Sequence, residues 1–518
     1  MPTTSVWMAN ADIPQHPPLS ADLETDVCVI GAGVAGMTAA YLLHRAGRRV
    51  VVVDAIGVAG GESHNTTAHC TTAMDDLYVT IAQTHGDDGA RLVARAQLGA
   101  LDQIEAIVTS ETLDCGFARV DGYLVPGKAD SAADLDDEAR AAQEAGLADV
   151  RRLEGAPMPG FTTTPSILFP RQVRLHVPRY LAGIARHLTS AGVAIHDGTR
   201  VTGVEHDGED GGRATVHCAT GANIRADHVV VATNSPVVDR LAIHTKQAPY
   251  RTYVVGFEVP RGSIPDVLLW DTEDPYHYVR IVAAADLGPD VEHDVLLVGG
   301  EDHKTGEADD GEARFAELAR WTRASIGASG TVPLGEPRWR WSGQVQEPAD
   351  FLGFAGRDPE HGGPVYVITG DSGQGITHGT IGAAVVSDLI LGRPSRWSDL
   401  YDPKRKPLGS FAAAYEMAKE NFDVAVRFIG DRITADSSDE AMPAPGSGVL
   451  VRRGTKVIAR YRDAQGTVHE RDAACTHLGC AVHWNSTEDS WDCPCHGSRF
   501  DPYGRVVAGP ASRDLGGL

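Results

Sequence analysis

The chain has 518 residues, which is too long for one ordinary hydrophobic core, so two or three domains are expected. Its 46 Lys and Arg against 70 Asp and Glu give a formal net charge of −24, which would repel nucleic-acid phosphates and an anionic membrane surface alike. No apolar run approaches the roughly 18 residues that span a bilayer, and the N-terminus lacks the pattern of a secretory signal. We therefore expect a cytoplasmic globular protein with no membrane span and no nucleic-acid partner.

After an N-terminal arm over residues 1–24, the segment from Asp26 to Asp54 predicts a strand, a glycine turn, a helix and a second strand. The turn reads GAGVAG and lies between strand and helix, the context in which this pattern indicates a dinucleotide. Its first glycine makes the tight turn, the second lets the backbone approach a pyrophosphate, and the third lets helix and strand pack closely. The phosphates would bind at the helix N-terminus. The candidate residues are Gly31, Gly33, Val34, Ala35 and Gly36.

Asp54 ends the second predicted strand, 23 residues after Gly31. At this position a carboxylate can accept hydrogen bonds from ribose hydroxyls, and it disfavours the 2′-phosphate of NADP. A glycine turn that binds no nucleotide is the alternative. The fingerprint alone does not distinguish FAD from NAD.

Further strands are predicted near residues 227–234, 294–300 and 364–371, and a helix over residues 179–190. This alternation predicts an α/β main body. Residues 365–379, VYVITGDSGQGITHG, predict a strand, a glycine-rich turn and a second helix start. The N–H groups of such a helix start can stabilise negative charge on a reduced flavin.

Together these segments resemble the D-amino-acid oxidase and glycine oxidase superfamily of FAD enzymes over residues 25–400. The resemblance rests on the N-terminal glycine fingerprint, on DHVVVATN, and on WSGQVQEPADFLGFAGR followed by ITGDSGQGITHG. It implies an α/β (α+β) FAD-binding domain of Rossmann type with an inserted β-sheet substrate domain. The FAD-binding parts are expected at about 25–80, 165–245 and 335–400, and the substrate-domain parts at about 81–164 and 246–334.

The resemblance also implies which residues contact the flavin or its pyrophosphate. They lie in GGESHNTTAHCTT, at the end of DHVVVATN and in the second glycine-rich turn: Ser63, Thr66, Thr67, His69, Thr233, Gly370, Asp371, Gly373, Gln374, Gly375 and Ile376. Some relatives attach FAD covalently through a histidine in the first of these segments. Asn65 occupies the aligned position here, so we expect non-covalent FAD, with His64 as the residue that would contradict this expectation.

The candidate catalytic residues are His378, Tyr253, Tyr278 and Arg280. His378 follows the flavin motif, and the others lie in the part of the chain that forms the substrate domain of relatives. Nearby arginines, including Arg251, would suit a substrate carboxylate because a guanidinium binds it in a bidentate fork. Aromatic packing beside a solvated charge is the alternative interpretation of Tyr250, Tyr253, Tyr276, His277 and Tyr278. For Glu301, Asp302, His303 and Lys304 a surface turn is the preferred interpretation.

Residues 401–435 are predicted to be connecting helices and a linker, because an amphipathic run from Ser410 to Arg432 leads into the polar, Pro- and Gly-containing ADSSDEAMPAPGSG. Residues 436–518 contain short β-prone runs broken by Gly and Asp. They predict a small all-β module.

Two loops of this module, CTHLGC at 475–480 and CPCHGS at 493–498, combine Cys-x-His with Cys-x-x-His across fifteen intervening residues. This spacing is typical of a Rieske [2Fe–2S] centre, in which Cys475 and Cys493 would hold one iron and His477 and His496 the other. Zinc is the competing interpretation, since mixed Cys and His ligands suit it too.

The double motif resembles the Rieske proteins of cytochrome bc complexes, and this resemblance implies a disulfide between Cys480 and Cys495, unusual as that is in the cytosol. It further implies that Ser498 donates a hydrogen bond to a cluster sulfur. Phe500 stands where high-potential relatives have a tyrosine donor, which predicts a lower potential here.

A flavin takes a hydride in one step, whereas a Rieske cluster carries one electron at a time, so their fusion predicts a converter between two-electron and one-electron chemistry. The superfamily resemblance implies oxidation of a C–N bond in a small amine or amino acid. An external one-electron carrier such as a ferredoxin would take or supply the electrons. The alternatives are a flavin/Rieske electron carrier or redox sensor without an organic substrate, an oxidase that uses oxygen, and a Rieske oxygenase with a further iron held by two histidines, here His64 and His69, and a carboxylate.

Overall fold

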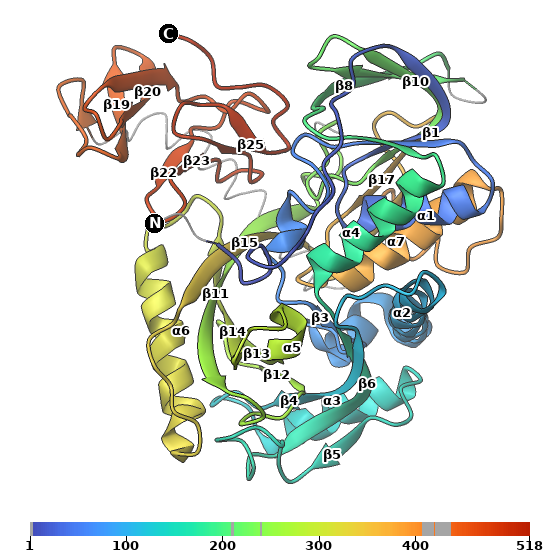
Figure 1. Cartoon of the computed structure of the whole chain (residues 1–518), viewed down its shortest axis with the longest axis vertical. Helices are drawn as coiled ribbons and strands as arrows, with labels where there is room; N and C mark the ends of the chain where they lie inside the picture. The colour runs from blue at the N-terminus through green and yellow to red at the C-terminus, as the bar shows by residue number, and fades with distance from the viewer. Residues whose placement is uncertain (1–3, 209–211, 239–240, 407–418, 420–436) are drawn as a thin grey trace.

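The computed structural model of the chain describes residues 4–208, 212–238, 241–406, 419 and 437–518. Two large β-sheets with their helices form the body of the molecule, and a smaller all-β module lies against one end of it (Figure 1). The α/β body and the all-β C-terminal module confirm the predicted fold class. Most of the predicted connecting segment, residues 401–435, lies outside the described residues.

The first sheet carries the predicted glycine turn, and its central strands are parallel. Val27 and Val29 face the helices on one side, and Cys28 and Ile30 face the β8–β9 pair on the other, because successive side chains of a strand point to opposite faces. Being covered on both faces, its strands are continuous apolar runs. In sheet order they are β16 (Phe354–Arg357), β17 (Val365–Thr369), β10 (Asn223–Val231), β1 (Leu23–Ile30), β2 (Val50–Val53) and β7 (Ala194–His196), with β9 (Ala214–Cys218) and β8 (Val201–His206) extending from β10.

Three helices pack against this sheet: α1 (Val34–Arg45), α4 (Val177–Ser190) and α7 (Gly375–Ile390). Helices α1 and α7 lie side by side, and a Cβ on Gly379 of α7 would be 3.2 Å from the backbone nitrogen of Ala35. The long α2 (Leu77–Ser110) packs on α7 and contains a kink at Gly86, where φ is 73°. The starts of α1 and α7 are therefore brought to the same end of the sheet.

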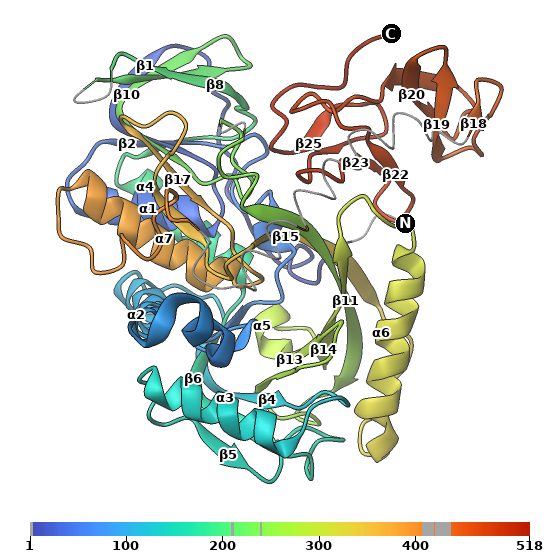
Figure 2. The ribbon, with the colours of Figure 1, turned by 180° about the vertical axis from the view of Figure 1, so that it is seen from behind.

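The second sheet is mainly antiparallel and curves beside the first (Figure 2). Helix α6 (Gly311–Ser325) covers one face, and α2 with α3 (Ala132–Glu144) covers part of the other. In sheet order the strands are β15 (Trp339–Pro348), β11 (Gln247–Pro260), β14 (His293–Lys304), β13 (His277–Val282), β12 (Leu268–Asp271), β4 (Ala118–Val125), β6 (Ser166–Arg174) and β3 (His69–Cys70), with β5 (Arg151–Leu153) on β6. Shorter helices are α5 (Ala284–Leu287), η1 (Glu62–His64) and η2 (Gly327–Ser329).

The second sheet contains strands from both predicted parts of the main body, and the division into FAD-binding and substrate-domain parts stays a prediction. Strands β3, β6 and β15 lie in parts that the sequence assigned to FAD binding, yet they pair in the second sheet. Their hydrogen-bonding partners are distant in sequence, and no local pattern identifies them. The second sheet is therefore built from strands of both predicted parts, and a cavity lies between it and the first sheet.

The C-terminal module consists of two small sheets around one core of apolar and cysteine side chains. One contains β18 (Ser437–Ser438), β19 (Ser447–Arg453), β20 (Lys456–Arg462) and β21 (Val468–Asp472), and the other β22 (His483–Asn485), β23 (Ser490–Asp492), β24 (Arg499–Phe500) and β25 (Val506–Ala508). The loops before β22 and after β23 carry the two cysteine and histidine motifs. Among the described helices, none has an apolar stretch long enough to cross a bilayer.

Candidate functional site

A cavity of about 640 Å³ lies between the two sheets. Its wall includes the glycine turn after β1, the segment before α2, the ends of β10 and β17, and the start of α7. Strands β11, β13 and β15 contribute side chains from the second sheet, and residues 507–509 and 512 contribute from the C-terminal module. One cavity is thus bounded by all three parts of the protein.

The glycine turn has the tight geometry that the sequence predicts. Gly31 has φ 108°, and a Cβ there would overlap the carbonyl oxygen of Ala232 at the end of β10. A Cβ on Gly36 would overlap the carbonyl oxygen of Gly31, so this glycine lets α1 begin directly against the turn. Gly31, Gly33, Val34 and Ala35 line the cavity, whereas Gly36 lies behind them.

Asp54 lines the cavity and also holds the turns around it. Its carboxylate accepts hydrogen bonds from the backbone N–H groups of Ala32 at 2.7 Å, Ile56 at 2.7 Å and Gly57 at 2.8 Å. Ser63, which was predicted to contact the cofactor, accepts a hydrogen bond from the N–H of Val34 at 3.2 Å. These polar side chains fix the first helix start from two sides.

The second helix start, at α7, also faces the cavity. Asp371, Gly373, Gln374, Gly375 and Ile376 line it, in a turn where Gly373 has φ 73°. The side chain of Gln374 is occupied elsewhere, since it donates to the carbonyl oxygen of Ala73 at 2.6 Å. Gly370 is the one predicted residue of this turn outside the lining; its φ of 73° shapes the chain instead.

Thr66, Thr67 and His69 line the cavity from the segment before α2, and Thr233 does so after β10. The ring of His69 makes contacts at 3.1 Å to the Thr67 hydroxyl and 3.2 Å to the carbonyl oxygen of Val279. Burial, reinforced by the charge of Arg280, lowers the pKa of His69 to about 3, so the ring is neutral.

Two predicted catalytic residues lie outside the cavity lining. Tyr253 points to the opposite face of β11 from the lining residues Tyr250 and Thr252, where it packs on His303 and Phe315 beneath α6. Arg280 donates to the carbonyl oxygens of Thr67 at 3.0 Å and Ala68 at 2.9 Å. Neither residue is among those that line the cavity, and their catalytic role stays a prediction.

Arg251 was the other candidate for a substrate carboxylate. It is 1% exposed and donates to the Ser342 hydroxyl, with Glu488 of the C-terminal module 3.8 Å away. Like Tyr253, it lies on the face of β11 that does not line the cavity. None of the substrate-domain arginines considered in the sequence is therefore in the cavity wall.

His378 and Tyr278 do line the cavity. The Nε2 atom of His378 lies 3.0 Å from the carbonyl oxygen of Thr369, and burial lowers its pKa to about 4, so it ties α7 to β17 as a neutral ring. The hydroxyl of Tyr278 forms a 2.7 Å hydrogen bond with that of Thr252, and its ring lies 5.7 Å from the ring of Tyr276.

Acidic side chains in this wall were missed from the sequence. Asp75, from the segment before α2, and Asp302, from β14, both line the cavity, whereas the sequence favours a surface turn for Asp302. Both oxygens of Asp302 are buried, and neither accepts a well-formed hydrogen bond from a residue that the structure describes. Burial raises the pKa of each of these two acids to about 7.

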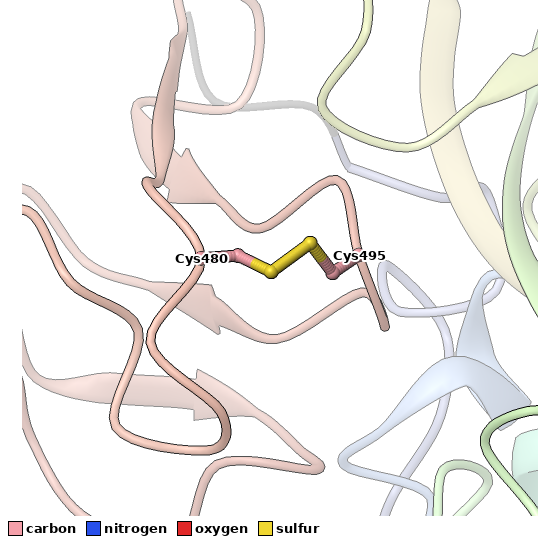
Figure 3. The surroundings of a disulfide bond; sticks show 2 residues. All are labelled: Cys480 and Cys495. Atoms are coloured by element: carbon pink, nitrogen blue, oxygen red, sulfur yellow. A yellow bond between two sulfur atoms is a disulfide. The ribbon is translucent and has the colours of Figure 1, made fainter. Parts of the chain in front are cut away.

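The C-terminal motifs converge. The sulfur atoms of Cys480 and Cys495 are bonded at 1.99 Å, which joins the two loops (Figure 3). The thiols of Cys475 and Cys493 interact directly, and the rings of His477 and His496 lie 5.0 Å apart. Among the described residues, the one set of three potential ligand atoms within 4.8 Å of each other is Cys480, Cys493 and Cys495. Because two of these sulfurs are bonded to each other, this set is not itself a metal site.

The C-terminal module docks on the edge of the second sheet through its cluster loops. The amide of Gln344 on β15 donates to the carbonyl oxygen of Gly497 at 3.1 Å, next to His496. The ring of His244 lies 4.8 Å from that of His477 and 5.4 Å from that of His496. Gln344 is also among the residues that line the cavity, so one buried residue contacts a cluster loop through its side chain and, through its backbone N–H, Glu62 of the cavity wall.

Residues 26–389, well over half of the chain, match the family model described as FAD dependent oxidoreductase. The chain belongs to this family. Residues 434–517 match the Rieske [2Fe-2S] domain, so this oxidoreductase uses FAD and a [2Fe–2S] cluster, and neither NAD nor zinc is the cofactor of the corresponding motifs.

Similar proteins have one or both parts. The oxidoreductase is 28% identical over 98% of its length to YhfW of Bacillus subtilis, which is described as a Rieske 2Fe-2S iron-sulfur protein and is covered over 96% of its own length. It is 57% identical over 61 residues to iron-sulfur subunit 1 of the cytochrome b6-f complex of Nostoc, which covers 12% of this chain and 34% of that subunit. Its fold resembles glycine oxidase from Geobacillus kaustophilus, with TM-score 0.59 and 16% identity over 74% of this chain and 99% of that one.

Both cofactors fit the residues present. For FAD, the helix starts of α1 and α7 face one cavity, and the turn before α1 leaves room for a close approach because its glycines lack side chains. For the cluster, two thiols and two imidazoles are paired, with Cys475, Cys493 and His496 buried and His477 partly buried, which is the donor set of a Rieske centre. The third iron site of an oxygenase has no counterpart in the described part of the chain, where His64 and His69 contact backbone carbonyls.

Proposed function

We propose that this oxidoreductase oxidises the C–N bond of a small amine at the FAD and passes the electrons singly through the Rieske cluster to an external carrier. The observation that carries the proposal is Gln344, which lines the cavity and binds the loop of His496. In the proposed assignment Cys475, His477, Cys493 and His496 hold the cluster, and FAD is bound without a covalent link. In this proposal electrons pass from the FAD to the cluster within one chain, with no further protein between them.

When bound, FAD supplies hydride acceptance and the cluster supplies one-electron transfer. The neutral amine loses a hydride, that is two electrons and one proton, from the carbon next to nitrogen, and water then hydrolyses the resulting iminium to a carbonyl product and ammonium. Two electrons must leave per turnover, one at a time, so the external acceptor is reduced twice. A ferredoxin-like carrier fits this requirement.

The residues of this chain position these components. The helix starts at Val34 and Gly375 present backbone N–H groups to phosphate and to the reduced ring. Arg280 holds the backbone of Thr67 and Ala68 against the cavity. Domain docking places His244 and β15 against the cluster loops.

The test is anaerobic reduction of the fully loaded protein, with the flavin and cluster absorbance followed separately. We expect two irons and two sulfides per chain, and amine addition should bleach the flavin before the cluster signal changes. The matched variant Cys475→Ser should lose the cluster yet still show flavin bleaching. Flavin reduction in the intact protein with no later change at the cluster would refute the proposal.

A further inference from the structure

The cavity wall is acidic where a carboxylate-binding site would be basic. Among the described lining residues, Arg200 is the one side chain with a permanent positive charge. Its guanidinium donates to the carbonyl oxygen of Val506 at 2.9 Å and interacts electrostatically with Asp54 and Asp514. A substrate carboxylate would therefore find no cation on the substrate side of the cavity.

Several cavity acids have a structural role. Asp54 and Asp371 accept hydrogen bonds from backbone N–H groups, and Glu62 accepts one from the N–H of Gln344 at 2.9 Å. Asp271 holds His277 through both its backbone and its ring. These contacts account for the presence of these four carboxylates without a ligand.

Asp302 differs from them. The hydroxyls of Thr252 and Tyr276 lie beside it and partly offset the effect of burial, but neither buried oxygen accepts a well-formed hydrogen bond from a described residue. An unsatisfied buried carboxylate is costly, so its presence in a cavity wall points to a ligand that supplies the missing partner. That partner must be a hydrogen-bond donor or a cation.

Asp75 lines the same cavity from the segment before α2. A Cβ on Gly373 would overlap the Oδ2 atom of Asp75 and would lie 3.7 Å from the hydroxyl of Tyr276, so these side chains meet over the turn that begins α7. The amide of Gln374 donates a weak hydrogen bond to the carboxylate of Asp75 at 3.5 Å. Asp75 and Asp302 repel each other electrostatically, which a cation between them would relieve.

The aromatic rings complete the arrangement. Tyr276 and Tyr278 pack at 5.7 Å with their planes tilted by 39°, and both line the cavity beside Asp302. The electron-rich faces of such rings attract ammonium groups. Acidic oxygens together with aromatic faces are suited to a cationic nitrogen and unsuited to an anion.

We propose that the substrate is a cationic amine without a carboxylate, whose ammonium group binds between Asp302, Asp75 and the rings of Tyr276 and Tyr278. This inference rests on the proposed function, because it assumes that the cavity is where the amine is oxidised. It narrows the substrate class from amines and amino acids to amines whose other groups are neutral or positive. The ammonium must lose a proton before the hydride can leave the neighbouring carbon, and the nearby carboxylates can accept that proton.

The test uses the loaded, oxidised holoprotein and three probes of equal chain length: n-butylamine, n-butanol and n-butanoate. Anaerobic titration calorimetry and the perturbation of the flavin spectrum measure binding without requiring turnover. We expect n-butylamine to bind at least tenfold more tightly than either of the others. Butanoate binding as tightly as the amine, or no binding by any of the three, would overturn the proposal.

Variants locate the binding. Asp302→Asn and, separately, Asp75→Asn should each weaken n-butylamine binding at least tenfold, whereas Asp87→Asn on the exposed surface of α2 should leave it unchanged. Unchanged amine binding in both cavity variants would also overturn the proposal. One outcome would refute this inference and leave the proposed electron transfer intact. In that outcome an amino acid with a carboxylate reduces the flavin and then the cluster, while n-butylamine does not bind.

Discussion

Replacing Asp302 by asparagine should make the substrate-free protein more stable at alkaline pH, because this carboxylate is buried and its oxygens accept no well-formed hydrogen bond from a described residue. Burial raises its pKa from 3.8 to about 7, an effect that Glu301 strengthens and that Thr252, Tyr276 and Arg314 oppose. An acid with a raised pKa in the folded state costs no stability below about pH 4. The cost grows as pH rises from about 4 to 7 and stays constant above that range, where the folded state must hold the charge.

The full difference between the two pKa values corresponds to about 4 kcal/mol, at about 1.36 kcal/mol for each tenfold change in proton affinity. The repulsion is shared with Asp75, and the new amide must itself be buried at a cost of about 1–3 kcal/mol. We therefore expect Asp302→Asn to stabilise the protein by about 1–2 kcal/mol at pH 8.5, and by less than half of that at pH 5.5.

Urea unfolding of the holoprotein, followed by flavin release, measures this difference as a shift of the midpoint at the two pH values. Asp87→Asn provides the control for removing a surface charge from the same region. A midpoint at pH 8.5 equal to or below that of the wild type would refute the reasoning. So would a difference that does not change between pH 5.5 and 8.5.

Three further predictions concern the cluster and its contact with the cavity. Gln344→Ala removes the hydrogen bond to Gly497, which is worth about 1 kcal/mol. We expect slower reduction of the cluster after rapid flavin reduction, measured by stopped-flow absorbance. The reduction potential of the cluster, measured by potentiometry, should not change. The hydroxyl of Ser498 accepts a hydrogen bond from the N–H of Ala511 and interacts with Cys475. Ser498→Ala should therefore lower the reduction potential of the cluster in an EPR-monitored titration. An unchanged potential would contradict a role for Ser498 in setting it. Replacing both Cys480 and Cys495 by serine opens a loop of 15 residues and should destabilise the module by about 3 kcal/mol, measured as earlier loss of cluster absorbance in denaturant; equal midpoints would contradict it.

The parts of the site that could be predicted from the sequence are those whose functional residues are neighbours in the chain. The glycine turn from Gly31 to Gly36 needs only its own backbone and the end of one strand. The Rieske loops combine ligands with fixed local spacing, and the Cys480–Cys495 bond follows from placing those loops face to face. In each case a few adjacent residues determine the geometry, so their order in the chain carries the information.

The substrate side could not be predicted in this way, because its residues are adjacent only in space. Tyr253 and Arg251 lie on the face of β11 opposite to Tyr250, and which face lines the cavity depends on pairing with β14 and β15. Asp75 and Asp302 are more than 200 positions apart, and neither belongs to a recognisable motif. Their common features, burial and mutual repulsion in one cavity wall, are properties of the folded arrangement.

The position of Arg251 links domain fusion to the charge of the cavity. The strand β11 that carries Tyr250 and Thr252 into the cavity presents Arg251 on its other face, toward Ser342 and Glu488. This cation thus serves the docking of the Rieske module, and moving it into the cavity would leave Glu488 without the arginine at that contact. An arginine that contacts the Rieske module cannot also bind a substrate anion in the cavity. The docking that places the cluster loop at Gln344 therefore also leaves the cavity acidic. Arg251→Gln should therefore weaken docking of the Rieske module, measured as faster protease cleavage between the FAD-binding body and that module. Binding of n-butylamine in the cavity should not change. Loss of amine binding with docking intact would contradict this assignment of Arg251.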